Sequence, residues 1–306
     1  MTRLTVPPPH SIFDVCMDDG AIVRLRRHGN LSGPRIILSH GNGLAINGYF
    51  PYWALLMDDF EVVVFDFRNC GENPVHDGVH GYDRFIADLD HIFDAIDAEY
   101  GKKPQIGAFH SMSSRTNLKY ALDGNRRLDG LVVFDPPMVP PAGHPLHERM
   151  AAEERVLWRW AQTRPDGFAD PSEQADLFMK SRMLSAWVDG AYDLMARSIL
   201  RRDAATGKWM LTCSGEREAE IYRQNAALTF WPEAGEFPMP ILAIASDPDS
   251  KIPSAPGFAC RALRDECGWP YECVSGTGHF MQIQKPAVCA GLTRRFAVEI
   301  GIADDA

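Results

Sequence analysis

The stretch Pro104–Leu118, PQIGAFHSMSSRTNL, joins a short apolar run to a helix-compatible segment through the three-residue turn at 110–112. The apolar run ends at Phe109, and the helical segment starts at Ser113. A strand that enters a helix through so short a turn places the turn residue at an exposed apex. Ser111 is therefore a candidate nucleophile, and it needs a base and an acid from elsewhere in the chain.

The composition is that of an ordinary globular protein. The chain has 306 residues, of which 45% are hydrophobic and 24% are charged. This is enough material for one large core, for two domains, or for one domain with a sizeable insertion. The net charge of -10 argues against nucleic acid or an anionic membrane as the main partner, since both favour a basic surface. A small-molecule substrate is the expected partner.

The cysteine pattern and the N-terminus bear on the compartment. Seven cysteines are scattered along the chain without a CxxC pair, which favours reduced thiols in a cytosolic protein and provides no zinc-type spacing. The first ten residues, MTRLTVPPPH, lack the apolar region of a signal peptide. No apolar run reaches the ~18 to 20 residues of a membrane-spanning helix. We expect a cytoplasmic protein with no metal or cofactor, and a homodimer is left open.

Strand patterns alternate with helix patterns in the first part of the chain. The expected strands are a hairpin at 10–28 and buried runs at 35–39, 61–67, 105–109 and 128–134, and the expected helices are 48–57, 82–100 and 113–122. Such alternation is typical of a parallel sheet covered by helices on both faces. A strand at 239–246, a helix at 256–267, a strand at 271–274 and a last helix at 286–300 resume it.

Between residues 138 and 236 the alternation stops. Large apolar residues are frequent there, but no strand run is visible. We interpret this region as a mostly helical insertion. The expected organisation is therefore a first core part at 1–137, the insertion at 138–236, and a second core part at 237–306.

His279 is the preferred base among the ten histidines. It follows the strand pattern at 271–274 and the loop Ser275-Gly276-Thr277-Gly278, and a glycine-bearing loop of this kind can bring an imidazole over the edge of the sheet. His110 adjoins the serine and is expected to pack locally. His40 begins the turn HGNG and is expected to brace it.

Three aspartates are candidates for the acid. Asp247 and Asp249 follow the strand pattern at 239–246, and Asp135 follows the one at 128–134. The carboxyl ends of parallel strands meet at one edge of the sheet, where open α/β folds bind their ligands. All three aspartates are therefore expected on the same edge as Ser111.

The segments HGNG, DFRNCG, FHSMSS, SDPDSKIP and GTGHF resemble those of the α/β-hydrolase superfamily, over roughly residues 10 to 300. The resemblance implies an α/β fold with a mostly parallel eight-stranded sheet flanked by helices. It also implies that the insertion at 138–236 is a helical cap. No cofactor or metal is part of this expectation.

The resemblance also implies roles for individual residues. Ser111 corresponds to the nucleophile and His279 to the base. Asp249 is the preferred acid because it stands four residues before a proline in a D-x-x-x-P pattern, with Asp135 and Asp247 as alternatives. The backbone N–H groups of Asn42 and Met112 correspond to the oxyanion hole.

Two positions depart from the family pattern. Asp66-x-Arg68-x-x-Gly71 matches a structural loop that usually reads D-x-R-G-x-G, with Asn69 here at the first glycine. Phe109 stands two residues before the serine, where the family usually has a small residue. A phenylalanine there requires a small neighbour to make room for it, or strain in the backbone around it.

The pattern as a whole predicts a serine hydrolase that cleaves an ester-type bond in a small to medium apolar substrate. A thioesterase, a lactonase or a carbon–carbon bond hydrolase would use the same triad, so these alternatives remain open. A haloalkane dehalogenase is disfavoured because its chemistry needs a carboxylate in place of Ser111. A second class, a binding or receptor protein with a vestigial triad, is kept open by Phe109.

Overall fold

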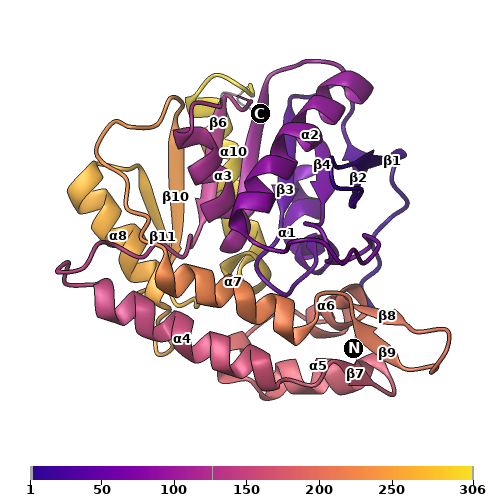
Figure 1. Cartoon of the computed structure of the whole chain (residues 1–306). Coiled ribbons are helices and arrows are strands. Elements are labelled where there is room, and N and C mark those ends of the chain that lie inside the picture. Colours follow the sequence, from indigo (N-terminus) through magenta and orange to yellow (C-terminus); the bar gives the residue numbers. More distant parts are fainter. Residues whose placement is uncertain (1–2, 126, 305–306) are drawn as a thin grey trace.

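The computed structural model describes residues 3–125 and 127–304 (Figure 1). Its main sheet has eight strands in the order β1-β2-β4-β3-β5-β6-β10-β11. The strands are β1 (Ser11–Cys16), β2 (Ile22–Gly29), β3 (Arg35–Ser39), β4 (Glu61–Phe65), β5 (Gln105–His110), β6 (Gly130–Phe134), β10 (Ile241–Ser246) and β11 (Tyr271–Val274). Only the β1–β2 and β2–β4 pairs are antiparallel. The expected mostly parallel eight-stranded sheet is confirmed.

Helices cover both faces of this sheet, as Figure 1 shows. The helices of the core are α1 (Phe50–Trp53), α2 (Tyr82–Tyr100), α3 (Met112–Leu122), α8 (Ala255–Cys267), α9 (Met281–Gln284) and α10 (Pro286–Glu299). Successive strand residues point to opposite faces, so Val63 packs with α2 in one apolar cluster and Val62 packs with α10 in the other. Strands buried on both faces explain the continuous apolar runs in the sequence.

The segment between β6 and β10 forms a separate group of elements below the sheet in Figure 1. It contains α4 (His147–Thr163), β7 (Gly167–Phe168), α5 (Pro171–Lys180), α6 (Ala191–Ile199), β8 (Leu200–Arg202), β9 (Trp209–Leu211) and α7 (Gly215–Ala227). The expectation that this region has no strand is wrong, because β7, β9 and β8 form a small antiparallel sheet. Strands of two or three residues are too short to show a period of two in the sequence.

The other expected elements are present with small shifts at their ends. The helix expected at 48–57 is broken into the short helices Ile46–Tyr49, α1 and Ala54–Leu56. Strand β6 begins at Gly130, two residues later than expected. Helix α2 has the expected bounds, because its apolar stripe is long and regular.

The ring of Phe109 fits because Gly107 lies beside it on the same face of β5. A Cβ atom on Gly107 would lie 2.4 Å from Phe109 Cε2. Phe109 is fully buried and packs edge-on against Phe65, with ring centroids 6.5 Å apart. The requirement for a small neighbour is thus met from within the strand, and the non-glycine residue with positive φ in this stretch is Ser111 rather than Phe109.

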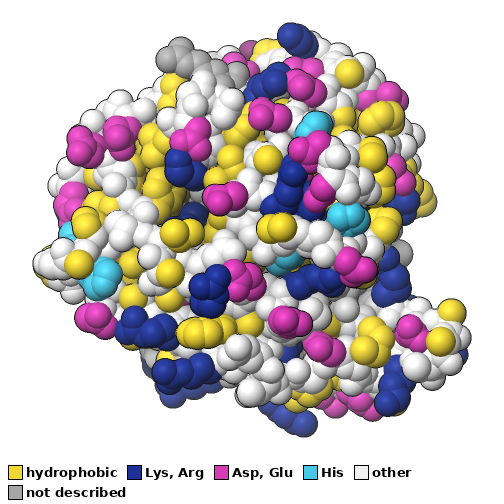
Figure 2. Space-filling view, viewed as in Figure 1, with side chains coloured by type: hydrophobic (Ala, Val, Ile, Leu, Met, Phe, Trp, Pro, Cys, Tyr) yellow, Lys and Arg dark blue, Asp and Glu magenta, His cyan; other side chains and the backbone are white. Residues whose placement is uncertain are grey.

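The surface in Figure 2 carries acidic and basic side chains interspersed rather than separated. All seven cysteine thiols are free. Within residues 3–125 and 127–304, no helix is both long and apolar enough to cross a membrane. The same described residues contain no cluster of three His, Cys, Asp or Glu side chains that could hold a metal ion.

Replacement of Gly107 by alanine should destabilise the protein through a direct collision with Phe109. We expect a loss of about 1–3 kcal/mol in the free energy of unfolding, the usual cost of overpacking a core. Chemical denaturation measures it. The matched experiment is a double-mutant cycle, in which Gly107→Ala should cost less in a Phe109→Ala background. Part of the cost should remain there, because the added Cβ would also lie 2.8 Å from Leu128 Cδ1. Equal costs in both backgrounds would show that Gly107 does not accommodate the ring.

Candidate active site

Ser111 sits at a strained turn between β5 and α3. Its backbone has φ 53° and ψ −117°, a conformation that non-glycine residues adopt only when their surroundings enforce it. The Ser113 hydroxyl is 2.9 Å from both the N–H and the carbonyl oxygen of His110. The Ser114 hydroxyl donates to the Phe109 carbonyl at 2.5 Å. The two serines after the turn therefore hold the helix start against the strand end.

Ser111, His279 and Asp135 form a continuous hydrogen-bonded chain. Ser111 Oγ lies 3.0 Å from His279 Nε2, and His279 Nδ1 lies 3.1 Å from Asp135 Oδ2. Because an ionised carboxylate can only accept, Nδ1 carries the proton and Nε2 is free to accept the serine proton. This is the tautomer that a general base next to a serine requires.

Asp135 is buried and held by two further donors. Its side chain is fully excluded from solvent. Asp135 Oδ1 accepts from the Ser246 backbone N–H at 2.9 Å, and Oδ2 accepts from the Ser254 hydroxyl at 2.9 Å. These bonds fix the carboxylate with one oxygen facing His279.

The structure does not bring Asp249, the preferred acid, to the imidazole. Its side chain is 81% exposed and pairs at 3.3 Å with Arg261. Its position after a strand predicted the edge of the sheet, and the D-x-x-x-P spacing made it the preferred acid, but the loop after β10 turns its carboxylate outward. Asp135, considered above as an alternative, takes the place beside His279 because it directly follows β6, which lies between β5 and β10.

Asp247 shapes the loop that carries the histidine. Its Oδ2 accepts from the Gly276 N–H at 2.7 Å, and its Oδ1 accepts from the Asp249 N–H at 2.9 Å. The hydrogen bond from Gly276 lowers the pKa of the Asp247 carboxyl. Asp247 therefore positions the approach to His279 rather than the imidazole itself.

The turn after β3 lies against the serine. A Cβ on Gly41 would be 3.3 Å from Ser111 Cβ, so the bare backbone comes close to the nucleophile. No hydrogen bond joins the N–H of Asn42 or of Met112 to another group in the part of the chain that the structure describes. Two free N–H groups beside a serine hydroxyl are what an oxyanion hole needs.

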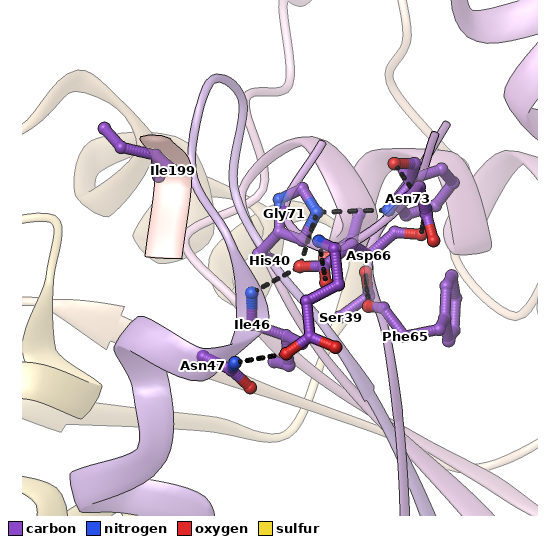
Figure 3. A network of polar contacts seen from close by, with 12 residues as sticks. Ser39, His40, Ile46, Asn47, Phe65, Asp66, Gly71, Asn73 and Ile199 are labelled. Carbon is purple, nitrogen blue, oxygen red and sulfur yellow. Dashed lines mark hydrogen bonds and ion pairs between the residues drawn. The ribbon is translucent and has the colours of Figure 1, made fainter. Parts of the chain in front are cut away.

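Figure 3 shows the polar network around His40 and Asp66 that stabilises the turn after β3. Asp66 Oδ1 accepts from the Ile46 N–H at 2.7 Å. His40 Nε2 accepts from the Phe67 N–H at 3.1 Å, so His40 braces the turn as expected. Asn73 Nδ2 donates to the Asp66 carbonyl at 2.6 Å. The loop that begins at Asp66 is thus structural, and it fixes where the turn after β3 sits.

Asn69, at the first glycine position of the family loop, has φ 63°. Asparagine tolerates this left-handed conformation better than most residues other than glycine. Its Oδ1 accepts from the His76 N–H at 2.6 Å. The departure from the family pattern therefore keeps the backbone shape that glycine provides.

His110 links three segments of the site through a directed chain of hydrogen bonds. His110 Nε2 donates to the His279 carbonyl at 2.9 Å, so Nδ1 accepts from the Tyr49 hydroxyl at 2.7 Å. The Tyr49 oxygen in turn accepts from the Gly41 N–H at 3.2 Å. Burial lowers the pKa of His110 well below its ordinary value, which keeps it neutral. The expectation of local packing therefore missed a residue that ties the histidine loop to the β3 turn.

A cavity of about 290 Å³ opens onto Ser111 and His279. Apolar side chains make up most of its wall: Leu44, Met112, Pro137, Val156, Leu157, Trp160, Phe178, Met183, Leu184, Pro256 and Phe280. Most of these come from the segment between β6 and β10. That segment and the carboxyl edge of the sheet therefore enclose one apolar site.

Several buried charged side chains line the same cavity. Arg164 and Glu218 form an ion pair at 2.5 Å with side chains 5% and 3% exposed. Burial raises the pKa of Glu218 to about 7 and that of Glu154 to about 8. Glu153 accepts from the Ala255 N–H at 3.0 Å. The sequence reasoning missed all four, because the helical patterns of α4 and α7 do not say which side chains face a cavity.

The arrangement of sheet, strained serine, histidine and buried aspartate is that of an α/β hydrolase. A model of the alpha/beta hydrolase family matches residues 36–292. The chain belongs to this family.

Solved structures with the same fold are similar to this chain at low identity. One is an E-2-(acetamidomethylene)succinate hydrolase, with TM-score 0.75 and 16% identity over 94% of this chain and 99% of that one. Another is a thioesterase domain from the curacin biosynthetic pathway, with TM-score 0.68 and 15% identity over 92% and 99%. A third is a thermophilic esterase from Thermogutta terrifontis, with TM-score 0.66 and 15% identity over 95% and 99%. A comparison with curated proteins gives no match.

The buried Glu154 should make stability fall as the pH rises. Its pKa is about 8 in the folded protein against an ordinary 4.5, so above pH 4.5 the unfolded chain loses a proton that the folded protein keeps. The Glu154 contribution is therefore fully present below pH 4.5. It declines by at most about 1.4 kcal/mol per pH unit up to pH 8.

Glu154→Gln removes this titration while keeping the shape of the side chain. We expect the variant to gain stability relative to wild type between pH 5 and 8, with little difference at pH 4.5. Urea unfolding at a series of pH values measures it. A stability difference that does not change with pH would contradict the raised pKa.

Proposed function

We propose that the protein is a serine hydrolase that cleaves an ester-type bond in a small, largely apolar substrate. The observation that carries the proposal is the chain from Ser111 Oγ to His279 Nε2 at 3.0 Å and from His279 Nδ1 to Asp135 Oδ2 at 3.1 Å. Membership of the alpha/beta hydrolase family supports hydrolysis as the class of reaction.

In the proposed mechanism, Ser111 attacks the carbonyl carbon of the ester while His279 takes its proton. Asp135 holds the imidazole and stabilises the imidazolium that forms. The backbone N–H groups of Asn42 and Met112 stabilise the oxyanion, and loss of one such donor typically raises the barrier by about 2.7 to 4 kcal/mol. His279 then protonates the leaving alcohol. Water releases the acyl group from Ser111 with His279 again acting as base.

The size and lining of the cavity support a small substrate. Its volume of about 290 Å³ is at the lower end of the range for ligand pockets, roughly 300 to 1,000 Å³. We infer that residues 138–236 act as a cap, because most of the apolar wall comes from them. Thioester, lactone or carbon–carbon bond cleavage would use the same three residues. We propose ester hydrolysis rather than these alternatives because it requires only the nucleophile, base and acid described above.

The decisive test is hydrolysis of short p-nitrophenyl esters by wild type and Ser111→Ala. We expect the variant to lose activity by at least about 10³-fold, since removal of the nucleophile leaves only binding and the oxyanion hole.

A fluorophosphonate probe should label wild type but neither Ser111→Ala nor His279→Ala. A folded wild type that neither hydrolyses esters nor takes the probe would favour a binding protein instead.

The two candidate acids provide a matched pair of variants. Asp135→Asn should lower kcat by about 10³- to 10⁴-fold, because the amide no longer enforces the productive histidine tautomer. Asp249→Asn should stay within about 2-fold of wild type, since that side chain is on the surface. Steady-state kinetics measures both, with thermal unfolding to confirm folding. The reverse order of effects would restore Asp249 as the acid.

A further inference from the structure

Five polar side chains on the cavity wall have no part in the proposed chemistry. They are Glu154, Arg164, Glu218, Tyr222 and Asn225. All belong to α4, α7 or the residues just after α4. In a cavity that is otherwise apolar, polar groups of this kind commonly set the orientation and selectivity of the ligand.

Arg164 and Glu218 bond to each other and to neighbouring side chains of the protein. Arg164 Nη1 pairs with Glu218 Oε2 at 2.5 Å, and Nη2 donates to Gln174 Oε1 at 3.3 Å. The Tyr222 hydroxyl reaches Glu218 Oε1 at 3.5 Å. The Arg164 charge is balanced by Glu218, so this group closes the cavity rather than attracting an ion.

Asn225 and Glu154 have hydrogen-bonding capacity to spare. Their side chains are joined by one bond, from Asn225 Nδ2 to Glu154 Oε2 at 3.0 Å, and the two residues are 2% and 4% exposed. Asn225 Oδ1 is buried without a partner. The Tyr82 hydroxyl approaches Asn225 from α2 but makes no bond of acceptable geometry and is itself unpartnered. A buried amide oxygen without a partner is uncommon.

Within residues 3–125 and 127–304, no ion pair joins Glu154 to a basic side chain. The nearby Arg115 donates instead to the carbonyls of Pro137 (2.7 Å) and Leu228 (2.8 Å). Burial without an ion pair raises the pKa of Glu154 to about 8, so near pH 7 its carboxyl group is protonated. A protonated carboxyl presents an O–H donor as well as an acceptor. The pair therefore offers one donor and one acceptor side by side.

We propose that the Asn225–Glu154 pair is a substrate-recognition site for a neutral group that both donates and accepts hydrogen bonds on one side, namely a primary carboxamide on the substrate. The amide N–H would donate to Asn225 Oδ1, and the amide C=O would accept from the Glu154 carboxyl. A carboxylate would lie among the carboxyl groups of Glu153, Glu154 and Glu218, and an ammonium group would share the cavity with Arg164. The inference rests on the proposed function only in that the substrate occupies the same cavity as Ser111.

Two esters of matched length separate this recognition from apolar binding. Ethyl succinamate carries a primary amide, whose N–H and C=O point the same way, at the end of its acyl chain, and ethyl 4-methylpentanoate carries an isopropyl group of the same shape there. In Ser111→Ala, which cannot turn them over, we expect the amide ester to bind at least about 10-fold more tightly, as a site built to hydrogen-bond a substrate rejects the analogue that lacks the group. Dissociation constants come from ligand-observed NMR titration.

Variants of the pair test which atoms are responsible. Added to Ser111→Ala, Asn225→Leu and Glu154→Met should each reduce the preference for the amide ester about 10-fold. Glu154→Gln should retain most of it, because a primary amide keeps a donor and an acceptor in nearly the same shape. Glu148→Gln is the control, since Glu148 lies on α4 with its side chain 79% exposed. Melting temperatures confirm that each variant is folded.

The outcomes distinguish this site from the proposed function. Equal affinities of the two esters for Ser111→Ala, or a preference that survives both Asn225→Leu and Glu154→Met, would overturn the recognition site even if wild type is an active esterase. A preference that depends on the pair supports the site even if wild type cleaves neither ester, because binding is measured without Ser111. In that case only the proposed hydrolysis fails.

Discussion

The buried carboxylate of Asp135 is the interaction on which the site depends. It accepts hydrogen bonds from Ser246 at the end of β10, from Ser254 before α8, and from His279 after β11. A buried charge is tolerated only when its hydrogen bonds are satisfied, so these three donors and the acid depend on one another. Asp135 thus joins the last third of the chain to the end of β6, and it fixes the histidine loop relative to the serine.

The backbone is strained at the residues that follow two neighbouring strands, β5 and β6. Ser111 follows β5 with φ 53°, and Asp135 follows β6 with φ 43°. The sheet supplies the restraint, because the Ser111 N–H donates to Phe134 and the Asp135 N–H donates to Ile244 on adjoining strands. Strained residues persist where the surrounding structure over-determines them. Here the parallel ladder, rather than the turn sequence, sets where Ser111 and Asp135 stand.

The segment between β6 and β10 adds the second half of the site. It supplies most of the apolar wall together with the buried pairs Arg164–Glu218 and Glu154–Asn225. The strand ends of the core and the helices α4 and α7 therefore both contribute side chains to the wall of one cavity.

The sequence by itself determined the alternation of strands and helices, the serine at the turn after β5 and the histidine after β11, because apolar periodicity and short turns are local signals. It also placed Asp135, Asp247 and Asp249 on one edge of the sheet. Only the tertiary structure decided among them, since the outward turn of the loop after β10 is not encoded in a spacing. The same holds for the contact of Glu154 with Asn225. Which side chains meet depends on how elements far apart in the chain pack together.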